Sequence, residues 1–143
     1  MRAIRWAGIY GISFLVILVV RIGLWITKYQ RIRAALVQAC PADPQYERRA
    51  TVARITHAVA HIARLIPDAS CLTQTISCQA ILSWKGIPST ITMGLKKDQH
   101  GALKAHAWLS WNDHVVLEGD EGTVTDFNKI LDLPTPLKTE TPS

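Results

Sequence analysis

A cysteine and a histidine are the residues of this chain best suited to covalent chemistry. Cys71 opens a helix within the segment 70–84, in which apolar residues recur at helical spacing and after which Gly86 can form a C-terminal cap. A thiol at a helix start lies near the positive end of the helix dipole and near unpaired amides, which stabilise the thiolate that attacks carbonyl carbons. His106 lies in a strand-like run, 103–111, where its imidazole could take the thiol proton and return it to a leaving amine. The pair predicts a nucleophile and its base.

The imidazole of such a pair needs a third group to fix its orientation, and a predicted hairpin supplies two candidates. The turn is expected at Asn112-Asp113. A two-residue turn sets His106 opposite Gly119, with Glu118 and Asp120 on either side. A three-residue turn slides the pairing by one and puts Asp120 directly across from His106. Both acids therefore stay open as the third member.

The remaining cysteines and histidines predict no metal site. There are three cysteines, Cys40, Cys71 and Cys78, and none are in CxxC spacing. The odd number and the spacing argue against a disulfide framework and against a four-thiolate zinc site. A reducing cytosol fits this pattern. Cys78, seven residues after Cys71, is predicted to be a small core hydrophobe. His57 and His61 lack the glutamate of an HExxH pair and are expected to be solvated. Neither GxxxxGK[ST] nor GxGxxG occurs, so no cofactor is expected.

The charge of the chain is basic without the pattern of a nucleic-acid binder. Lysine and arginine total 16 against 11 acidic residues, a formal charge of +5. These basic residues come in pairs and triplets and are not interleaved with aromatics, so nucleic acid is excluded as a partner. An acidic protein surface or membrane phosphates remain compatible with the charge.

The first forty residues carry an apolar segment that is expected to be helical. Arg21 separates the apolar run 6–20 from the second piece 22–26, so an uninterrupted membrane span of about twenty residues is not expected. The alternatives are a hydrophobic helix packed on the protein, which we favour, and a helix lying on the membrane through residues 6–33. The polar edge of its second half would consist of Arg21, Lys28, Arg31 and Arg33.

The elements that must position the cysteine and histidine form an α+β domain. A helix is predicted to start near Pro44, which Asp43 can cap, with a buried stripe running from Val52 to Ile66. Strands are expected over 89–95, 103–111 and 114–117. The cysteine helix would then pack on one face of a small antiparallel sheet. Trp84, Trp108 and Trp111 are expected to fill the core beneath the hairpin.

These motifs resemble the stand-alone leader peptidases of lasso-peptide biosynthesis, cysteine proteases of the microcin-processing type. The resemblance rests on the order and spacing of five motifs and covers nearly the whole chain. They are Leu65-Ile66-Pro67 before Ser70-Cys71-Leu72, Gly86-Ile87-Pro88, Gly94, Ala105-His106-Ala107-Trp108 and Glu118-Gly119-Asp120.

The resemblance implies a transglutaminase-like, papain-like cysteine peptidase core with an apolar N-terminal helical extension. The expected organisation is 1–40 as that extension, 41–132 as the peptidase domain and 133–143 as a flexible, proline-bearing tail. The family's Cys-His-Asp triad falls on Cys71 and His106, while the third member is Glu118 by ungapped spacing and Asp120 by chemical identity.

The implied function is removal of the leader from a ribosomally made precursor peptide in the cytoplasm, with membrane association left open. A separate asparagine-synthetase-like lasso cyclase would then close the ring. Since about forty residues precede Pro41, too few for a winged-helix leader-recognition domain, a separate leader-recognition protein is the expected partner. The alternatives are a non-catalytic scaffold and a membrane-associated transglutaminase-like acyltransferase of the same fold.

Overall fold

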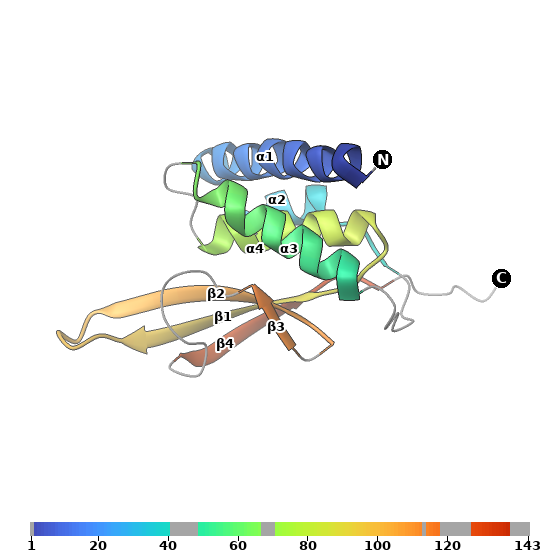
Figure 1. Ribbon diagram of the computed structural model, residues 1–143. Coiled ribbons are helices and arrows are strands. Elements are labelled where there is room, and N and C mark those ends of the chain that lie inside the picture. Colours follow the sequence, from blue (N-terminus) through green and yellow to red (C-terminus); the bar gives the residue numbers. More distant parts are fainter. Residues whose placement is uncertain (1, 41–48, 67–70, 113, 118–126, 138–143) are drawn as a thin grey trace.

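A layer of helices covers one side of an antiparallel sheet. The computed structural model describes residues 2–40, 49–66, 71–112, 114–117 and 127–137. Its helices are α1 (Arg2–Ile26), α2 (Tyr29–Leu36), α3 (Arg49–Ala63) and α4 (Cys71–Trp84). Its strands are β1 (Thr90–Lys97), β2 (Leu103–Trp111), β3 (His114–Leu117) and β4 (Asn128–Pro134). In Figure 1, α1 is the outermost layer, the other helices lie beneath it, and the sheet lies below them. The predicted α+β class is confirmed.

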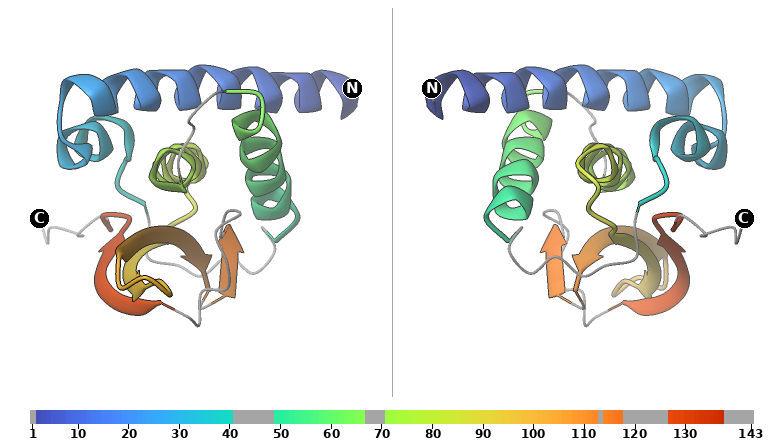
Figure 2. Two further views of the ribbon diagram at one scale, coloured as in Figure 1. Left: turned by 90° about the vertical axis from the view of Figure 1, so that its left-hand side faces the viewer. Right: turned by 90° about the vertical axis from the view of Figure 1, so that its right-hand side faces the viewer.

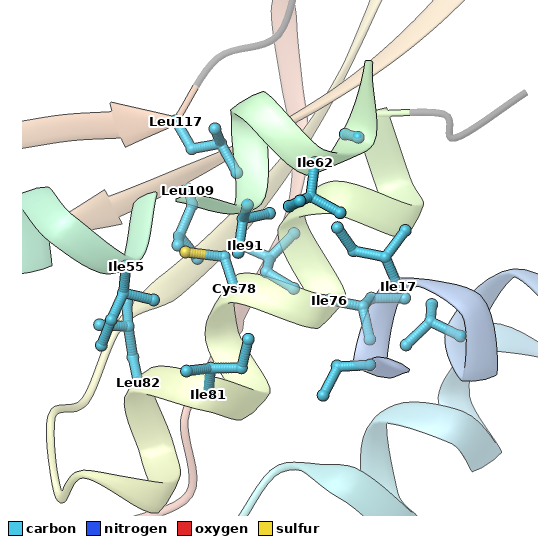
Figure 3. Packing of buried hydrophobic residues seen from close by; sticks show 14 of the residues in the cluster. Ile17, Ile55, Ile62, Ile76, Cys78, Ile81, Leu82, Ile91, Leu109 and Leu117 are labelled. Carbon is cyan, nitrogen blue, oxygen red and sulfur yellow. The ribbon is translucent and has the colours of Figure 1, made fainter. Parts of the chain in front are cut away.

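One hydrophobic core joins the helices to the sheet. Ile17 of α1, Ile55 of α3 and Ile76 of α4 are buried in the same cluster as Ile91 of β1 and Leu109 of β2. Figure 3 shows the sheet residues pointing toward Cys78 and its neighbours on α4. The predicted stripe of α3 is confirmed as buried from Val52 to Ile62, with Ile66 also buried beyond its end. Its start near Pro44 lies outside the described residues. The apolar first helix thus shares one core with the rest of the domain.

Helix α1 is continuous through Arg21, the charge on which the expectation against an uninterrupted membrane span rested. The helix runs through to Ile26, and its segment Ala7–Ile26 is long and apolar enough to cross a membrane, with a mean hydropathy of 2.3. Arg21 is accommodated because its guanidinium lies 4.8 Å from the ring centroid of Trp25, one helical turn away. Most of the segment is not buried in the protein.

The sheet has the order β3-β2-β1-β4, with antiparallel pairs throughout its described part. Strand β4 was not predicted, and it corrects the expectation of a flexible end over residues 133–137. β4 pairs with β1, and the Thr135 N–H then donates to the Ser89 carbonyl at 2.8 Å. Backbone pairing, rather than side-chain burial, orders this stretch, because most β4 side chains are exposed.

A buried glutamine of α4 links α2 to the start of β1 and to the end of β4. Gln79 is fully buried, and its amide nitrogen donates to the carbonyls of Ser89 at 3.1 Å and Leu133 at 2.9 Å. Its amide oxygen accepts from Nε of Arg33 at 2.9 Å, and the same guanidinium also donates to the Pro134 carbonyl. The sequence analysis had put Arg33 on the polar edge of a helix. In the structure it links α2 to α4 and β4 instead.

The tryptophans do not share one core, which corrects a second expectation. Trp84 is exposed along one side, and its indole N–H donates to the Leu36 carbonyl at 2.7 Å, so it fastens α2 to α4. Trp111 is half-buried against the main core. Trp108 is buried on the other face of β2, as described below.

Candidate active site

The structure places Cys71 where the sequence predicted it, at the first residue of α4. It is half-buried and packs against the hydrophobic core. Cys40 and Cys78 are fully buried, and none of the three is in a disulfide. Burial raises the pKa of the Cys78 thiol well above its ordinary range, which confirms its expected role as a core residue. Cys71 is thus the most accessible of the three thiols.

The helix that presents Cys71 is well defined at its far end. Gly86 has a φ of 76°, the left-handed conformation that glycine adopts without strain, and its N–H donates to the Ser83 carbonyl at 3.0 Å. The Ile87 N–H reaches back to the Leu82 carbonyl at 2.9 Å. These bonds cap α4 as the sequence predicted and direct the chain into β1.

His106 lies near the middle of β2 and is almost completely buried, with 1% of its surface exposed. Its ring centroid is 5.0 Å from that of Phe127 and 6.0 Å from that of Trp108. Side chains alternate along a strand, so His106 and Trp108 share one face of β2, whereas Ala107 and Leu109 belong to the core shared with α4. The described ring contacts of the imidazole are therefore on the sheet face that turns away from the helices.

The elements that carry Cys71 and His106 are brought together. Helix α4 packs directly on β2. Both elements begin at the end of the molecule to which the β1–β2 hairpin points, so the first turn of α4 overlies the N-terminal half of β2 (Figure 1). Figure 2 shows α4 end-on between α1 and the curled sheet. The elements of Cys71 and His106 thus adjoin at the same end of the molecule, while the described ring contacts of the imidazole lie on the face of β2 opposite to α4.

Neither candidate for the third member, Glu118 or Asp120, lies within the described residues. The hairpin before them is described as far as Leu117, and its turn has two residues, because Trp111 pairs with His114. Asn112 has a φ of 49°, which asparagine tolerates better than most residues. A bulge between Leu109 and Ser110 then shifts the register by one. Beyond the bulge, Leu109 faces Leu117, which is the register that the sequence analysis had assigned to a three-residue turn.

Gly94 and Phe127 also lie next to His106, and sequence reasoning had not assigned them this role. Gly94 is the β1 partner of His106. A Cβ atom on Gly94 would lie 2.9 Å from the Trp108 ring and 2.9 Å from Cβ of Phe127, so only glycine lets the two rings close over the strand. The one sequence signal for the role of Gly94 was its place among the ordered motifs of the family resemblance. Phe127 follows residues without a strand pattern, and nothing in the sequence marked it.

Described residues line a cavity at either end of β2. The cavity at the hairpin end has a volume of about 490 Å³ and includes Phe127 in its wall, so it adjoins the aromatic group around His106. Its other lining residues are mostly basic or polar: Lys96, Lys97, Asp98, Gln99, His100 and Lys104. Asp98 also accepts backbone N–H bonds from His100 and Ala102 in the turn. This cavity is suited to an anionic group.

The cavity at the opposite end has a volume of about 590 Å³ and a polar wall that includes Thr92, Ser110 and Asp132. The Thr92 hydroxyl donates to Asp132 at 2.7 Å, and Lys129 forms an ion pair with the same carboxylate. The Lys129 hydrogen bond lowers the pKa of Asp132 against the opposing effect of burial. The cavity lies at the Thr90–Ser110 end of the sheet, away from the hairpin end where α4 begins.

The histidine pair of α3 is on the surface of the protein. His57 and His61 are exposed and stack on each other with ring centroids 6.2 Å apart. Within the described ranges, no group of three or more histidine, cysteine, aspartate or glutamate side chains could hold a metal ion.

A partly exposed cysteine at a helix start is placed for nucleophilic chemistry, because the helix dipole and unpaired amides stabilise its thiolate. Residues 14–132 match the transglutaminase-like superfamily, a span that runs from the middle of α1 to β4. The chain therefore belongs to the transglutaminase-like superfamily, which includes cysteine peptidases and acyltransferases. No curated protein and no solved structure gives a significant match to the chain.

Proposed function

We propose that the protein is a cysteine endopeptidase that removes the leader from a ribosomally made lasso-peptide precursor, with Cys71 as nucleophile and His106 as base. The observation that carries the proposal is the position of Cys71, half-exposed at the start of a helix that packs on the strand of His106. Membership of the superfamily supports the cysteine chemistry, and the ordered motifs of the sequence support the leader-peptidase assignment.

The proposed reaction proceeds through an acyl-enzyme. The Cys71 thiolate attacks the carbonyl carbon at the leader–core junction, and backbone amides at the helix start, including its own, stabilise the oxyanion. The C–N bond breaks as the imidazolium of His106 gives its proton to the departing core amine. Water, deprotonated by His106, then cleaves the thioester, which releases the leader acid and restores the thiol. A carboxylate orients the imidazole, and the described register of β2 and β3 supports Asp120 over Glu118 for this role.

The basic cavity beside Phe127 supports a peptide substrate with acidic side chains near the cut site. Three lysines line it, and it shares Phe127 with the surroundings of His106. A carboxylate entering there would be attracted by Lys96 and Lys104, while the adjoining peptide would lie toward β2. A separate leader-recognition protein would deliver the precursor, and a separate lasso cyclase would use the freed core amine.

The decisive experiment incubates purified protein, precursor and leader-recognition protein, and follows the products by mass spectrometry. We expect a leader acid and a free core from the wild type and neither from Cys71→Ala. Cys78→Ala serves as the matched control, because it removes a buried thiol from the same helix. An intact precursor with both the wild type and Cys71→Ala would favour a non-catalytic scaffold, and cleavage at the wild-type rate by Cys71→Ala would contradict the proposal. A leader joined to an added amine would instead identify an acyltransferase.

A further inference from the structure

The outer face of α1 is an unbroken apolar surface, formed by large side chains that project away from the domain. Its members range from 36% to 79% exposed: Ile12, Phe14, Leu15, Leu18, Val19, Ile22, Trp25 and Ile26. At 100° per residue, these positions span an arc of roughly 160° around the helix. Such a surface costs free energy in water and marks a binding face.

The opposite face of α1 is fixed to the protein. Ser13, Ile17 and Val20 are fully buried, and α1 packs on both α3 and α4. Figures 1 and 2 show α1 lying across these helices, on the side of the molecule remote from the sheet. Crossing a membrane would pull Ile17 and Val20 out of the core. The packing therefore favours a helix that lies along a surface.

The chemistry of this face distinguishes a lipid surface from a protein partner. No acidic residue occurs in residues 1–40, while six basic residues do: Arg2, Arg5, Arg21, Lys28, Arg31 and Arg33. Arg21 borders the apolar arc and lies over the Trp25 ring, and Lys28 and Arg31 are exposed in the residues that follow α1. Apolar side chains edged by cations, with a tryptophan at one end, suit acyl chains beneath anionic headgroups. Protein interfaces carry more polar area than this arc does.

We propose that α1 binds in the plane of an anionic lipid bilayer, with the eight side chains of its outer face in the boundary between headgroups and acyl chains. The helices α3 and α4 then lie between the bilayer and the sheet, and β2 faces the aqueous side. This inference is independent of the proposed peptidase activity.

Vesicle flotation tests the proposal with the full chain. We expect the wild type to float with vesicles of phosphatidylcholine and phosphatidylglycerol, and less with phosphatidylcholine alone. The double substitution Leu15→Glu, Val19→Glu should weaken binding by at least about tenfold, because it puts two charges into the apolar boundary. Leu103→Glu is the matched control, since Leu103 is 64% exposed on β2, and it should bind as the wild type does. Far-ultraviolet circular dichroism and the unfolding midpoint verify that the variants are folded.

Two outcomes of the flotation and sedimentation measurements would overturn the proposal. One is flotation of the double variant at the wild-type level. The other is the absence of vesicle binding together with a protein contact that covers α1, either in a lipid-free dimer or in a complex with another protein. Sedimentation detects both species. The depth of the helix is read from the bromolipid quenching that Leu15→Trp adds in a Trp25→Phe background, after the quenching of Trp25→Phe alone, which keeps four tryptophans, has been subtracted. Bromines near the headgroups should quench this added fluorescence most, whereas strongest quenching by bromines at the acyl-chain ends would mean that α1 spans the bilayer.

Discussion

The guanidinium of Arg33 on α2 donates to the buried amide oxygen of Gln79 on α4 across 2.9 Å. Burial lowers the pKa of Arg33. The amide nitrogen of Gln79 in turn holds the ends of β1 and β4 through two carbonyls. One side chain thus joins the helical layer to both strands at the far end of α4 from Cys71.

Replacing this glutamine should destabilise the protein strongly. In Gln79→Leu, the carbonyls of Ser89 and Leu133 lose a buried donor and Arg33 loses an acceptor, so we expect a loss of roughly 2–4 kcal/mol in the free energy of unfolding. Urea denaturation measures it. Arg33→Ala should lower the free energy of unfolding by less than Gln79→Leu does. The Arg33 guanidinium is partly exposed, so water can reach the acceptors that it leaves. Equal stability of Gln79→Leu and the wild type would show that the hydrogen bonds of Gln79 do not stabilise the fold.

The three thiols should differ sharply in reactivity. Alkylation requires the thiolate, and burial holds the pKa of Cys78 far above neutral pH and shields its sulfur. Brief treatment with iodoacetamide at pH 7.5 should therefore modify Cys71 first, giving one added group by intact mass. Cys71→Ser should take up none under the same conditions, and denatured wild type should take up three. Rapid modification of Cys78 in the folded protein would contradict the packing of α4.

His106 should act on the cysteine and not only on the fold. In His106→Asn, we expect cleavage of the precursor to fall by at least about a hundredfold. The rate of Cys71 alkylation near neutral pH should also fall, because the thiolate loses its imidazolium partner. Trp108→Phe is the control for packing, since it changes an aromatic neighbour of His106. If His106→Asn is folded and its Cys71 is alkylated at the wild-type rate, His106 does not activate the Cys71 thiol.

The third member can be assigned by comparing two isosteric changes. The register that pairs Leu109 with Leu117 supports Asp120, so Asp120→Asn should lower the cleavage rate much more than Glu118→Gln. A loss confined to Glu118→Gln would reverse the assignment. Equal activity in both variants would place the orienting group elsewhere.

Gly94 is predicted to be intolerant of any side chain. Gly94→Ala places a methyl group 2.9 Å from the Trp108 ring and from Cβ of Phe127, and we expect a loss of about 1–3 kcal/mol in the free energy of unfolding. Gly11→Ala is the matched control, because a Cβ there meets nothing within 4 Å and alanine favours a helix. Thermal unfolding of the two variants measures the contrast, and a stable Gly94→Ala variant would show that Phe127 can move aside.

The sequence predicted the elements with strong local patterns. The start of α4 at Cys71 and the bounds of β2 and β3 agree with the structure, because periodicity, the Gly86 cap and a two-residue turn determine them locally. β4 escaped prediction since an exposed edge strand has little apolar alternation. The bulge after Leu109 and the ring of Phe127 near His106 depend on tertiary packing, which periodicity does not encode.

The pairing of β4 also sets the order in which the chain can mature. Arg33 and Pro134 are 101 positions apart, and the Cys40 N–H donates to the Pro136 carbonyl at 2.8 Å. During synthesis, α2 and α4 therefore acquire these partners only after residues 133–136 have left the ribosome. Until residues 128–137 emerge, β1 has an open edge that can pair with other strands. A nascent chain stalled before β4 is the state most exposed to aggregation, and it is where chaperone dependence should be greatest.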